Sequence, residues 1–257
     1  MPEGRTGCSV LTKADYVYVI GGYDPDSRHV NTVYQLSLKT YKWTTMAPMG
    51  TERYLYAAVL QGGYIYIYIH AFGGIGRNNR LASAERYSIA NNTWEDLPDM
   101  SEMRCGHSAV AAPSSSIIYI TGGFGRIILE LFDAISLRWK RDSNVIDMPE
   151  KRKNAAVVML QDRYSVVIGG RDRNGIGHIA GSFICDCTFN CWSSTPASMD
   201  MSTERYDHTA AELDGNIIVA GGYGKGINSS MESVGVCSFD LSDSDRLFRS
   251  NYYSWES

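Results

Sequence analysis

The sequence predicts an all-β fold built from one four-stranded unit that occurs five times. Five Gly-Gly pairs recur about fifty residues apart, and each ends a short run of β-branched and aromatic residues. A tryptophan follows each of the first four pairs, and an arginine precedes each unit. Runs of this length, bounded by turn residues, fit strands better than helices. Such a unit cannot bury its own apolar faces, so it must stack on its neighbours.

Each unit is predicted to contain four short strands. The first follows the arginine, at residues 8–11, 56–60, 108–112, 155–160 and 209–213. A tight turn leads to the second, which ends at the diglycine, at residues 16–20, 65–72, 117–121, 164–168 and 217–220. The third follows a polar loop, at residues 33–36, 85–88, 129–132, 182–185 and 234–240. The fourth holds the tryptophan, except in the fifth unit, where residues 247–248 stand in its place.

The diglycine and the tryptophan form the structural signature of the repeat. Its members are Gly21, Gly22, Trp43, Gly73, Gly74, Trp94, Gly122, Gly123, Trp139, Gly169, Gly170, Trp192, Gly221 and Gly222. Glycine tolerates positive φ and has no side chain, so a pair lets the backbone turn where units crowd. The tryptophan is expected to supply much of the apolar area between one unit and the next.

Three phrases carry a resemblance to a known repeat. Residues 16–22 read Tyr-Val-Tyr-Val-Ile-Gly-Gly, residues 85–94 read Glu-Arg-Tyr-Ser-Ile-Ala-Asn-Asn-Thr-Trp, and residues 104–109 read Arg-Cys-Gly-His-Ser-Ala. The pattern resembles the kelch repeat over nearly the whole chain, which implies a β-propeller of four-stranded kelch blades. Five blades are visible, at about residues 5–49, 53–100, 104–149, 152–201 and 205–250 of a single 1–257 domain. The ring is either a closed five-bladed one or an incomplete six-bladed one.

Composition limits the possible partners and location. The net charge of −4 and the pI of about 5.7 argue against nucleic acid as a partner. No apolar stretch approaches the roughly 18 residues needed to span a membrane. The N-terminus has no secretory apolar region, so a cytoplasmic, reducing location is expected. The clustered Cys185, Cys187 and Cys191 are interpreted as packed thiols, with a metal or redox-sensing site as the alternative.

The arginines that precede the first strands are the main candidates for a binding site. If these strands are innermost, as the resemblance implies, Arg53, Arg104, Arg152 and Arg205 surround one mouth of the central channel, with Arg5 in the same slot of the first unit. Arginine suits carboxylates, so an acidic peptide of a protein partner is expected there. Tyr54 and Tyr206 follow two of these arginines and are typical of interface hot spots. The structural alternative is pairing with local backbone or with an acid such as Glu52 or Glu204.

The resemblance implies a non-catalytic protein-interaction module. It is closest to the kelch domains of BTB-kelch proteins, which are substrate receptors of cullin-3 ubiquitin ligases; actin is a second partner class of the family. No BTB or BACK domain is found in these 257 residues. The alternative is a small-molecule or sugar-processing propeller enzyme that uses His107 and His208, three residues after an arginine. No catalytic constellation, cofactor site or metal site is predicted, and the oligomeric state stays open.

Overall fold

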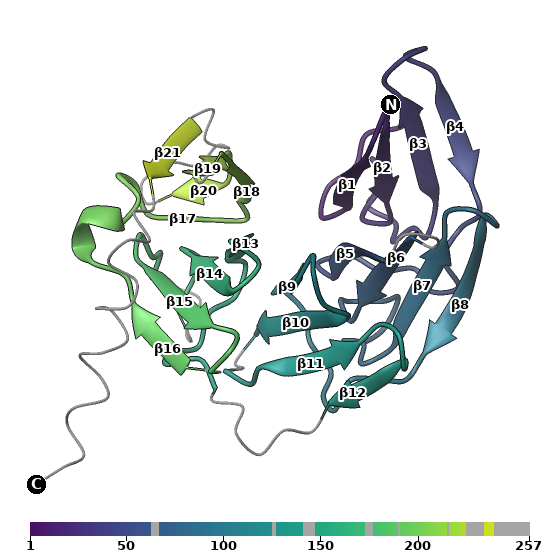
Figure 1. The fold of residues 1–257 in the computed structure, drawn as a ribbon. Helices are drawn as coiled ribbons and strands as arrows, with labels where there is room; N and C mark the ends of the chain where they lie inside the picture. Colours follow the sequence, from purple (N-terminus) through teal and green to yellow (C-terminus); the bar gives the residue numbers. More distant parts are fainter. Residues whose placement is uncertain are drawn as a thin grey trace, which may run out of the picture. The chain divides into compact units, whose positions relative to one another are not determined.

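The computed structural model describes residues 1–62, 67–124, 127–140, 147–172, 177–189, 191–214, 216–224 and 234–238. Apart from one 3-10 turn at Ala197–Met199, the elements described are β-strands, and each four-stranded sheet is antiparallel with its strands in chain order (Figure 1). This confirms the predicted all-β fold of repeated four-stranded blades. None of the helical structure described is long and apolar enough to cross a membrane.

Four blades have four strands each. Blade 1 contains β1 (Ser9–Lys13), β2 (Tyr16–Ile20), β3 (Val33–Ser37) and β4 (Trp43–Met46). Blade 2 contains β5 (Ala57–Gly62), β6 (Ile67–Phe72), β7 (Ala84–Ser88) and β8 (Thr93–Leu97). Blade 3 contains β9 (His107–Ala111), β10 (Ile117–Gly122), β11 (Glu130–Asp133) and β12 (Arg138–Lys140). Blade 4 contains β13 (Ala156–Leu160), β14 (Tyr164–Ile168), β15 (Ser182–Asp186) and β16 (Cys191–Ser194).

Blade 5 is described through three strands, β18 (Thr209–Leu213), β19 (Asn216–Ala220) and β21 (Val234–Ser238). A short pair, β17 (Arg205–Tyr206) with β20 (Tyr223–Gly224), precedes and follows its first hairpin. The predicted fourth strand near residues 247–248 lies outside the described residues, as do residues 65–66 and 239–240 of two other predicted strands.

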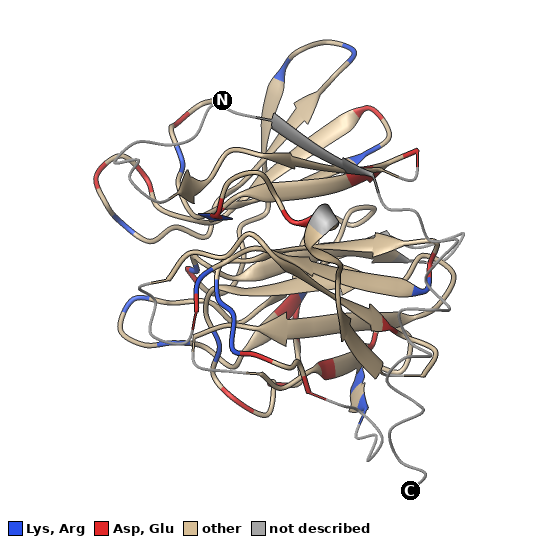
Figure 2. Cartoon of the chain, turned by 90° about the vertical axis from the view of Figure 1, so that its left-hand side faces the viewer, with Lys and Arg blue, Asp and Glu red and all other residues tan. Residues whose placement is uncertain are grey.

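The chain forms two compact units. The first contains residues 1–120 and 130–140, and the second contains residues 121–129 and 141–257. In both units the charged residues lie mainly in loops and at strand ends, while the strands are largely uncharged (Figure 2). This distribution leaves the faces of the blades apolar, as stacking requires.

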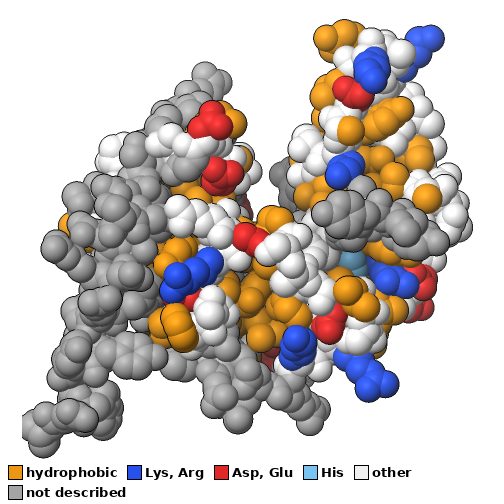
Figure 3. Space-filling model, in the orientation of Figure 1, with side chains coloured by type: hydrophobic (Ala, Val, Ile, Leu, Met, Phe, Trp, Pro, Cys, Tyr) orange, Lys and Arg blue, Asp and Glu red, His pale blue; other side chains and the backbone are white. Residues whose placement is uncertain are grey.

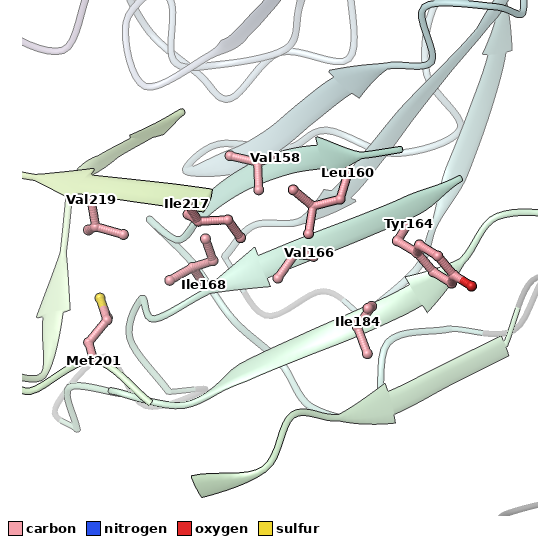
Figure 4. Packing of buried hydrophobic residues seen from close by; sticks show 9 residues of the cluster. All are labelled: Val158, Leu160, Tyr164, Val166, Ile168, Ile184, Met201, Ile217 and Val219. Carbon is pink, nitrogen blue, oxygen red and sulfur yellow. The ribbon is translucent and has the colours of Figure 1, made fainter. Parts of the chain in front are cut away.

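Apolar side chains of successive blades pack together within each unit. In the first unit, Tyr18 and Ile20 of blade 1 pack with Ile69 and Tyr87 of blade 2. In the second unit, blades 4 and 5 share a buried cluster, in which side chains from β13, β14, β15 and β19 meet (Figure 4). Its members are Val158, Leu160, Tyr164, Val166, Ile168, Ile184, Met201, Ile217 and Val219.

The diglycines lie in close contact with the neighbouring blade. Gly73 and Gly74 have φ of 58° and 97°, values that side chains rarely adopt. A Cβ on Gly73 would lie 2.8 Å from the Arg104 carbonyl oxygen, and the Gly74 N–H donates to that oxygen at 2.8 Å. The same bond recurs from Gly22 to Arg53, from Gly123 to Arg152 and from Gly170 to Arg205. The diglycine of one blade is therefore bonded to the arginine of the next.

The tryptophans also join consecutive blades. The indole N–H of Trp94 in blade 2 donates to the Ala47 carbonyl oxygen after blade 1 at 2.9 Å. Trp139 of blade 3 donates in the same way to Pro98 after blade 2, at 2.8 Å. Each indole thus combines apolar contact with one directional bond, as buried tryptophan usually does.

Candidate functional site

The arginine slot is the first place to test for a binding site. Arg53 lies just before β5 and has no exposed surface. Its Nη1 donates to the carbonyl oxygens of Gly73 at 2.8 Å and Ser83 at 3.0 Å, and its Nη2 lies 2.6 Å from Glu85 Oε1. The guanidinium is therefore bonded inside its own blade and points away from solvent.

Arg104 repeats this arrangement in blade 3. Its Nε and Nη2 lie 3.0 and 2.7 Å from Oε1 of Glu130, the first residue of β11. The carboxylates of Glu85 and Glu130 also accept backbone N–H groups of the turn before the arginine, including the Ser101 N–H at 3.0 Å. Each carboxylate thus connects an arginine to the turn before it.

Arg152 occupies the same slot in blade 4 but has a different partner. Phe183 stands where blades 2 and 3 have glutamate, and the guanidinium lies over its ring at 4.1 Å. The Arg152 Nη1 donates to the Gly181 carbonyl oxygen at 2.6 Å. Burial lowers the pKa of Arg152 to about 10, so the side chain is still charged at neutral pH.

The first and fifth units complete the series. The Arg5 Nη2 lies 2.5 Å from Thr32 Oγ1, and its guanidinium stacks over Tyr34. Buried Arg205 donates to the Gly221 carbonyl oxygen at 3.1 Å. The arginines are thus placed as the structural alternative describes, and their side chains contact their own blade. Glu52 does not pair with Arg53 as considered from the sequence; it lies 3.1 Å from Arg77.

The residue after the arginine is partly or fully exposed in four of the five units, and the exception is the buried Cys105 of blade 3. In the first unit, the half-buried Tyr54 packs against Tyr23 and His29, with ring centroids 4.2 and 4.8 Å apart. His29 Nε2 lies 2.9 Å from the Tyr23 hydroxyl. Burial, followed by a hydrogen bond shared with Tyr23, raises the pKa of Tyr54 to about 12. We call these three residues the first aromatic cluster.

The second unit carries an equivalent surface, which we call the cation–aromatic ladder. Lys153 Nζ lies 4.6 Å from the centre of the Phe124 ring, and the backbone of Lys153 is bridged to that of Arg171. The Arg171 guanidinium lies 4.5 Å over Tyr206. Two more rings pack against Tyr206 and extend the ladder. The ring centroids of His178 and Tyr223 lie 5.0 and 5.5 Å from that of Tyr206.

Both surfaces occupy the same positions of the repeat. Tyr23, Phe124, Arg171 and Tyr223 each follow a diglycine, whereas Tyr54, Lys153 and Tyr206 each follow an arginine. Phe124 and Tyr223 remain 46% and 41% exposed. Among the described side chains on the face in Figure 3, lysines and arginines are scattered between hydrophobic and uncharged polar side chains.

The sequence predicted Tyr54 and Tyr206 as binding residues. It did not predict the aromatic residues that pack around them or the buried Glu85 and Glu130. His29 and His178 lie in loops of differing length, so no fixed spacing marks them, whereas Phe124 directly follows a diglycine and could have been found from that position. Glu85 and Glu130 do carry a signal, because both stand at the start of the third strand of their unit. That signal recurs in only two blades, since Tyr34 and Phe183 hold the position in blades 1 and 4.

His107 and His208 are buried beside the diglycine of the preceding blade. A Cβ on Gly73 would lie 2.9 Å from His107 Cε1, and the same distance separates Gly169 from His208. Burial, with a smaller effect of Arg104, lowers the pKa of His107 to about 3; burial and Arg205 lower that of His208 to about 4. Both rings are therefore neutral near pH 7, and burial hides them from a substrate.

No group of three or more His, Cys, Asp or Glu side chains within the described residues is arranged to hold a metal ion. Tyr56 occupies the His107 slot in blade 2, where its hydroxyl donates to the Ile20 carbonyl oxygen at 2.7 Å. A tyrosine and two histidines thus fill one packing position against the diglycines of blades 1, 2 and 4.

The diglycine, the buried arginine and the interblade tryptophan together define a kelch-repeat protein. Residues 1–170 match the KLHDC2/KLHL20/DRC7 Kelch-repeats domain, and the chain belongs to this family. Membership of this family supports the interpretation of the chain as a kelch protein-interaction module.

Relatives share parts of this chain. Kelch-like protein 40 of Mus musculus is 32% identical over 130 residues, which cover 51% of this chain and 20% of the relative. Kelch-like protein 41a of Danio rerio is 26% identical over 124 residues, which cover 48% of this chain and 20% of the relative. F-box/kelch-repeat protein At2g44130 of Arabidopsis thaliana is 27% identical over 207 residues, which cover 77% of this chain and 44% of the relative. The chain thus spans about a fifth of the two kelch-like relatives and less than half of the plant protein.

Proposed function

We propose that this chain is a non-catalytic protein-interaction module whose partner binds the residues that follow the diglycines and the arginines. The observation that carries the proposal is that equivalent repeat positions in both units hold partly exposed aromatic rings packed on one another or on cations. Tyrosine, tryptophan and arginine dominate the binding energy of protein interfaces. The buried arginines serve this surface by fixing the backbone that presents it.

The partner is proposed to contribute an acidic peptide segment. Lys153 and Arg171 of the ladder are partly exposed and already stack on aromatic rings, so little side-chain entropy is lost when they bind a carboxylate. The overall negative charge argues against nucleic acid as a competitor for these cations.

The proposed biological setting is substrate recognition for a ubiquitin ligase, in the cytoplasm. The names of some relatives combine kelch repeats with an F-box or with a RING finger domain, and others are kelch-like proteins. The kelch-like resemblance favours a cullin-3 adaptor, and an actin-binding scaffold is the other setting. The alternative of a propeller enzyme that uses His107 and His208 has less support, because both rings are buried and neutral.

A paired capture experiment tests the proposal. The chain, its Tyr54→Ala and Tyr206→Ala variants and two control variants serve as baits in a cytosolic extract, and the retained proteins are quantified by mass spectrometry. The controls are Tyr41→Ala and Phe189→Ala, which remove exposed aromatic residues from strand-connecting turns in the same two units. We expect a partner to be retained by the parent and both controls, and to be reduced at least fivefold by a folded Tyr54 or Tyr206 variant.

The captured partner then allows a direct measurement. Binding of its acidic segment is expected to weaken with salt and with Lys153→Ala or Arg171→Ala, because surface charge pairs are screened. Equal losses with the control variants, or binding that no ladder variant changes, would refute the proposed surface. Recovery of a cullin, of actin, or of a small-molecule turnover activity would distinguish the settings.

A further inference from the structure

Two histidines lie at equivalent positions on the two surfaces that carry the proposed function. His29 and His178 are each bridged to the first residue after a diglycine. Each imidazole packs on the tyrosine that follows the arginine of the next blade. The ring centroids of His29 and Tyr54 are 4.8 Å apart, with 41° between the ring planes. Those of His178 and Tyr206 are 5.0 Å apart, with 38° between the planes. Both compact units therefore contain the same histidine–tyrosine contact.

The other three of the five histidines are buried. Burial lowers the pKa to about 3 for His70 and His107, and to about 4 for His208, so all three are neutral near pH 7. His29 and His178 are only half-buried. Histidine is the side chain whose charge ordinarily changes between about pH 5 and pH 8. The two histidines that can exchange a proton at the surface are thus the two that lie on the proposed binding surfaces.

The first aromatic cluster has a contact for each charge state of His29. His29 Nε2 lies 2.9 Å from the Tyr23 hydroxyl, which can donate to a neutral imidazole or accept from a protonated one. A cation within about 6 Å of a tyrosine ring is attracted to its face, so the Tyr54 ring holds a protonated His29 in place. A proton can therefore be gained without breaking the cluster.

The charged side chains of the loop that holds His29 are two acids and one base. Arg28 Nε lies 2.9 Å from Asp24 Oδ2, and its Nη2 lies 2.5 Å from Asp26 Oδ2. Glu3 of the N-terminal segment is also within electrostatic reach of Arg28. The charge of Arg28 is thus compensated by acids. Protonation of His29 would turn the first aromatic cluster from neutral to cationic.

His178 makes the same contact beside a permanent cation. The Arg171 guanidinium lies 4.5 Å over the Tyr206 ring that His178 also contacts. Asp172 is the next residue of the same loop, and the Asp207 carboxylate is within electrostatic reach of Arg171. A proton on His178 therefore adds charge to a surface that is already cationic at high pH. Its relative effect on an acidic ligand is expected to be smaller than that of His29.

We propose that His29 and His178 contact the partner and bind its carboxylates when they are protonated, so that an acidic segment is held more tightly as pH falls. This inference rests on the proposed function and adds a proton dependence to it. Exposed charge pairs change an affinity by roughly 1.5- to 5-fold. Within that range we expect about threefold from His29 and about twofold from His178.

Binding of a fluorescein-labelled hexa-aspartate peptide to the full chain tests the proposal, by fluorescence anisotropy at about pH 5.5 and about pH 8. Aspartate has an ordinary pKa of about 3.9, so the peptide stays ionised at both values. The parent is expected to bind about sixfold more tightly at the lower pH. His29→Gln should reduce this ratio to about twofold, and His178→Gln should reduce it to about threefold.

The higher pH separates a charge effect from a packing effect. Both glutamine variants should bind there as the parent does, because the histidines are neutral, and His29→Lys should bind about threefold more tightly than the parent. His29→Phe keeps a ring on Tyr54 and gives the same readout if glutamine disturbs the packing. Lys39→Gln is the matched control, because it removes an exposed cation from a turn of the same compact unit and should keep the parent's ratio.

The outcomes distinguish this inference from the proposed function. A ratio that the histidine variants leave unchanged, or a loss as large at the higher pH as at the lower, would overturn the inference. The acidic-segment proposal would still stand in that case if Lys153→Ala and Arg171→Ala weaken binding at both pH values. A peptide that binds at neither pH, or equally to every variant, would overturn both. Circular dichroism at both pH values confirms that each variant is folded.

Discussion

Substitution of Glu85 by glutamine tests whether the repeat arginines hold the blades together. Glu85 and Arg53 are both almost fully buried, with Arg53 Nη2 at 2.6 Å from Glu85 Oε1. Removing one partner leaves the other charge buried and uncompensated, which typically costs about 3–5 kcal/mol. The Gly50 N–H donates to Oε2 of Glu85 and the Thr51 N–H to Oε1, so glutamine can still accept one of these two bonds, and we expect the lower end, about 3 kcal/mol.

The assay is urea unfolding followed by tryptophan fluorescence, with hydrogen exchange to locate the loss within the first unit. A change of about 3 kcal/mol corresponds to a decrease in Tm of roughly 6–12 °C for a chain of this size. The matched control is Glu95→Gln in the same blade, because Glu95 pairs with Arg86 but is 52% exposed. Exposed pairs contribute about 0–1 kcal/mol, so the control should change little.

Two results would refute the reasoning. One is a Glu85→Gln variant that is destabilised no more than Glu95→Gln. The other is strict additivity between Glu85→Leu and Arg53→Leu, because removing both charges should restore part of the stability that either single variant loses.

Three further predictions concern the other repeat positions. Gly73→Ala should destabilise by more than about 2 kcal/mol in chemical unfolding, because it adds a Cβ at positive φ against the Arg104 carbonyl, whereas Gly4→Ala, with 3.7 Å to its nearest atom, should be neutral. Trp94→Phe should lower unfolding free energy by about 1 kcal/mol beyond the loss of ring area, since the Ala47 carbonyl loses its donor. The pKa of His107 is depressed in the folded state to about 3, so the unfolded chain binds more protons and stability is lost as pH falls from about 6.5. His107→Tyr should flatten unfolding free energy against pH there; an unchanged slope would contradict this.

The strand pattern could be read from the sequence because its causes are local. The runs at residues 16–20 and 164–168 were predicted at the observed bounds of β2 and β14. The first strand of blade 1 was predicted at 8–11 and is observed at Ser9–Lys13. That difference arises at the hairpin, where Lys13 pairs with Tyr16 and extends the ladder into residues that composition marks as turn.

The partners of the buried arginines could not be predicted, because the repeat does not fix them. One position of the third strand faces the arginine in each of blades 1 to 4, yet it holds tyrosine, glutamate or phenylalanine. A hydroxyl, a carboxylate and an aromatic face all satisfy a buried guanidinium that is already bonded to carbonyl oxygens of its blade. Within this chain the arginine therefore recurs in every unit, whereas the residue that faces it changes.

The sequence predicts one binding site that contains the arginines and the tyrosines that follow them. Because side chains alternate along a strand, the arginine and the tyrosine have different roles. Arg205 and Tyr206 are consecutive residues of β17, so their side chains must point to opposite sides. Arg205 is 4% exposed and bonds to Gly221, while Tyr206 lies partly exposed against Arg171 and His178. A partner therefore cannot contact both members of an Arg-Tyr pair equally. Since the guanidinium is required inside the blade, variation that changes partner choice is expected at the position after the arginine, which is accessible at Thr6, Tyr54, Lys153 and Tyr206 but buried at Cys105.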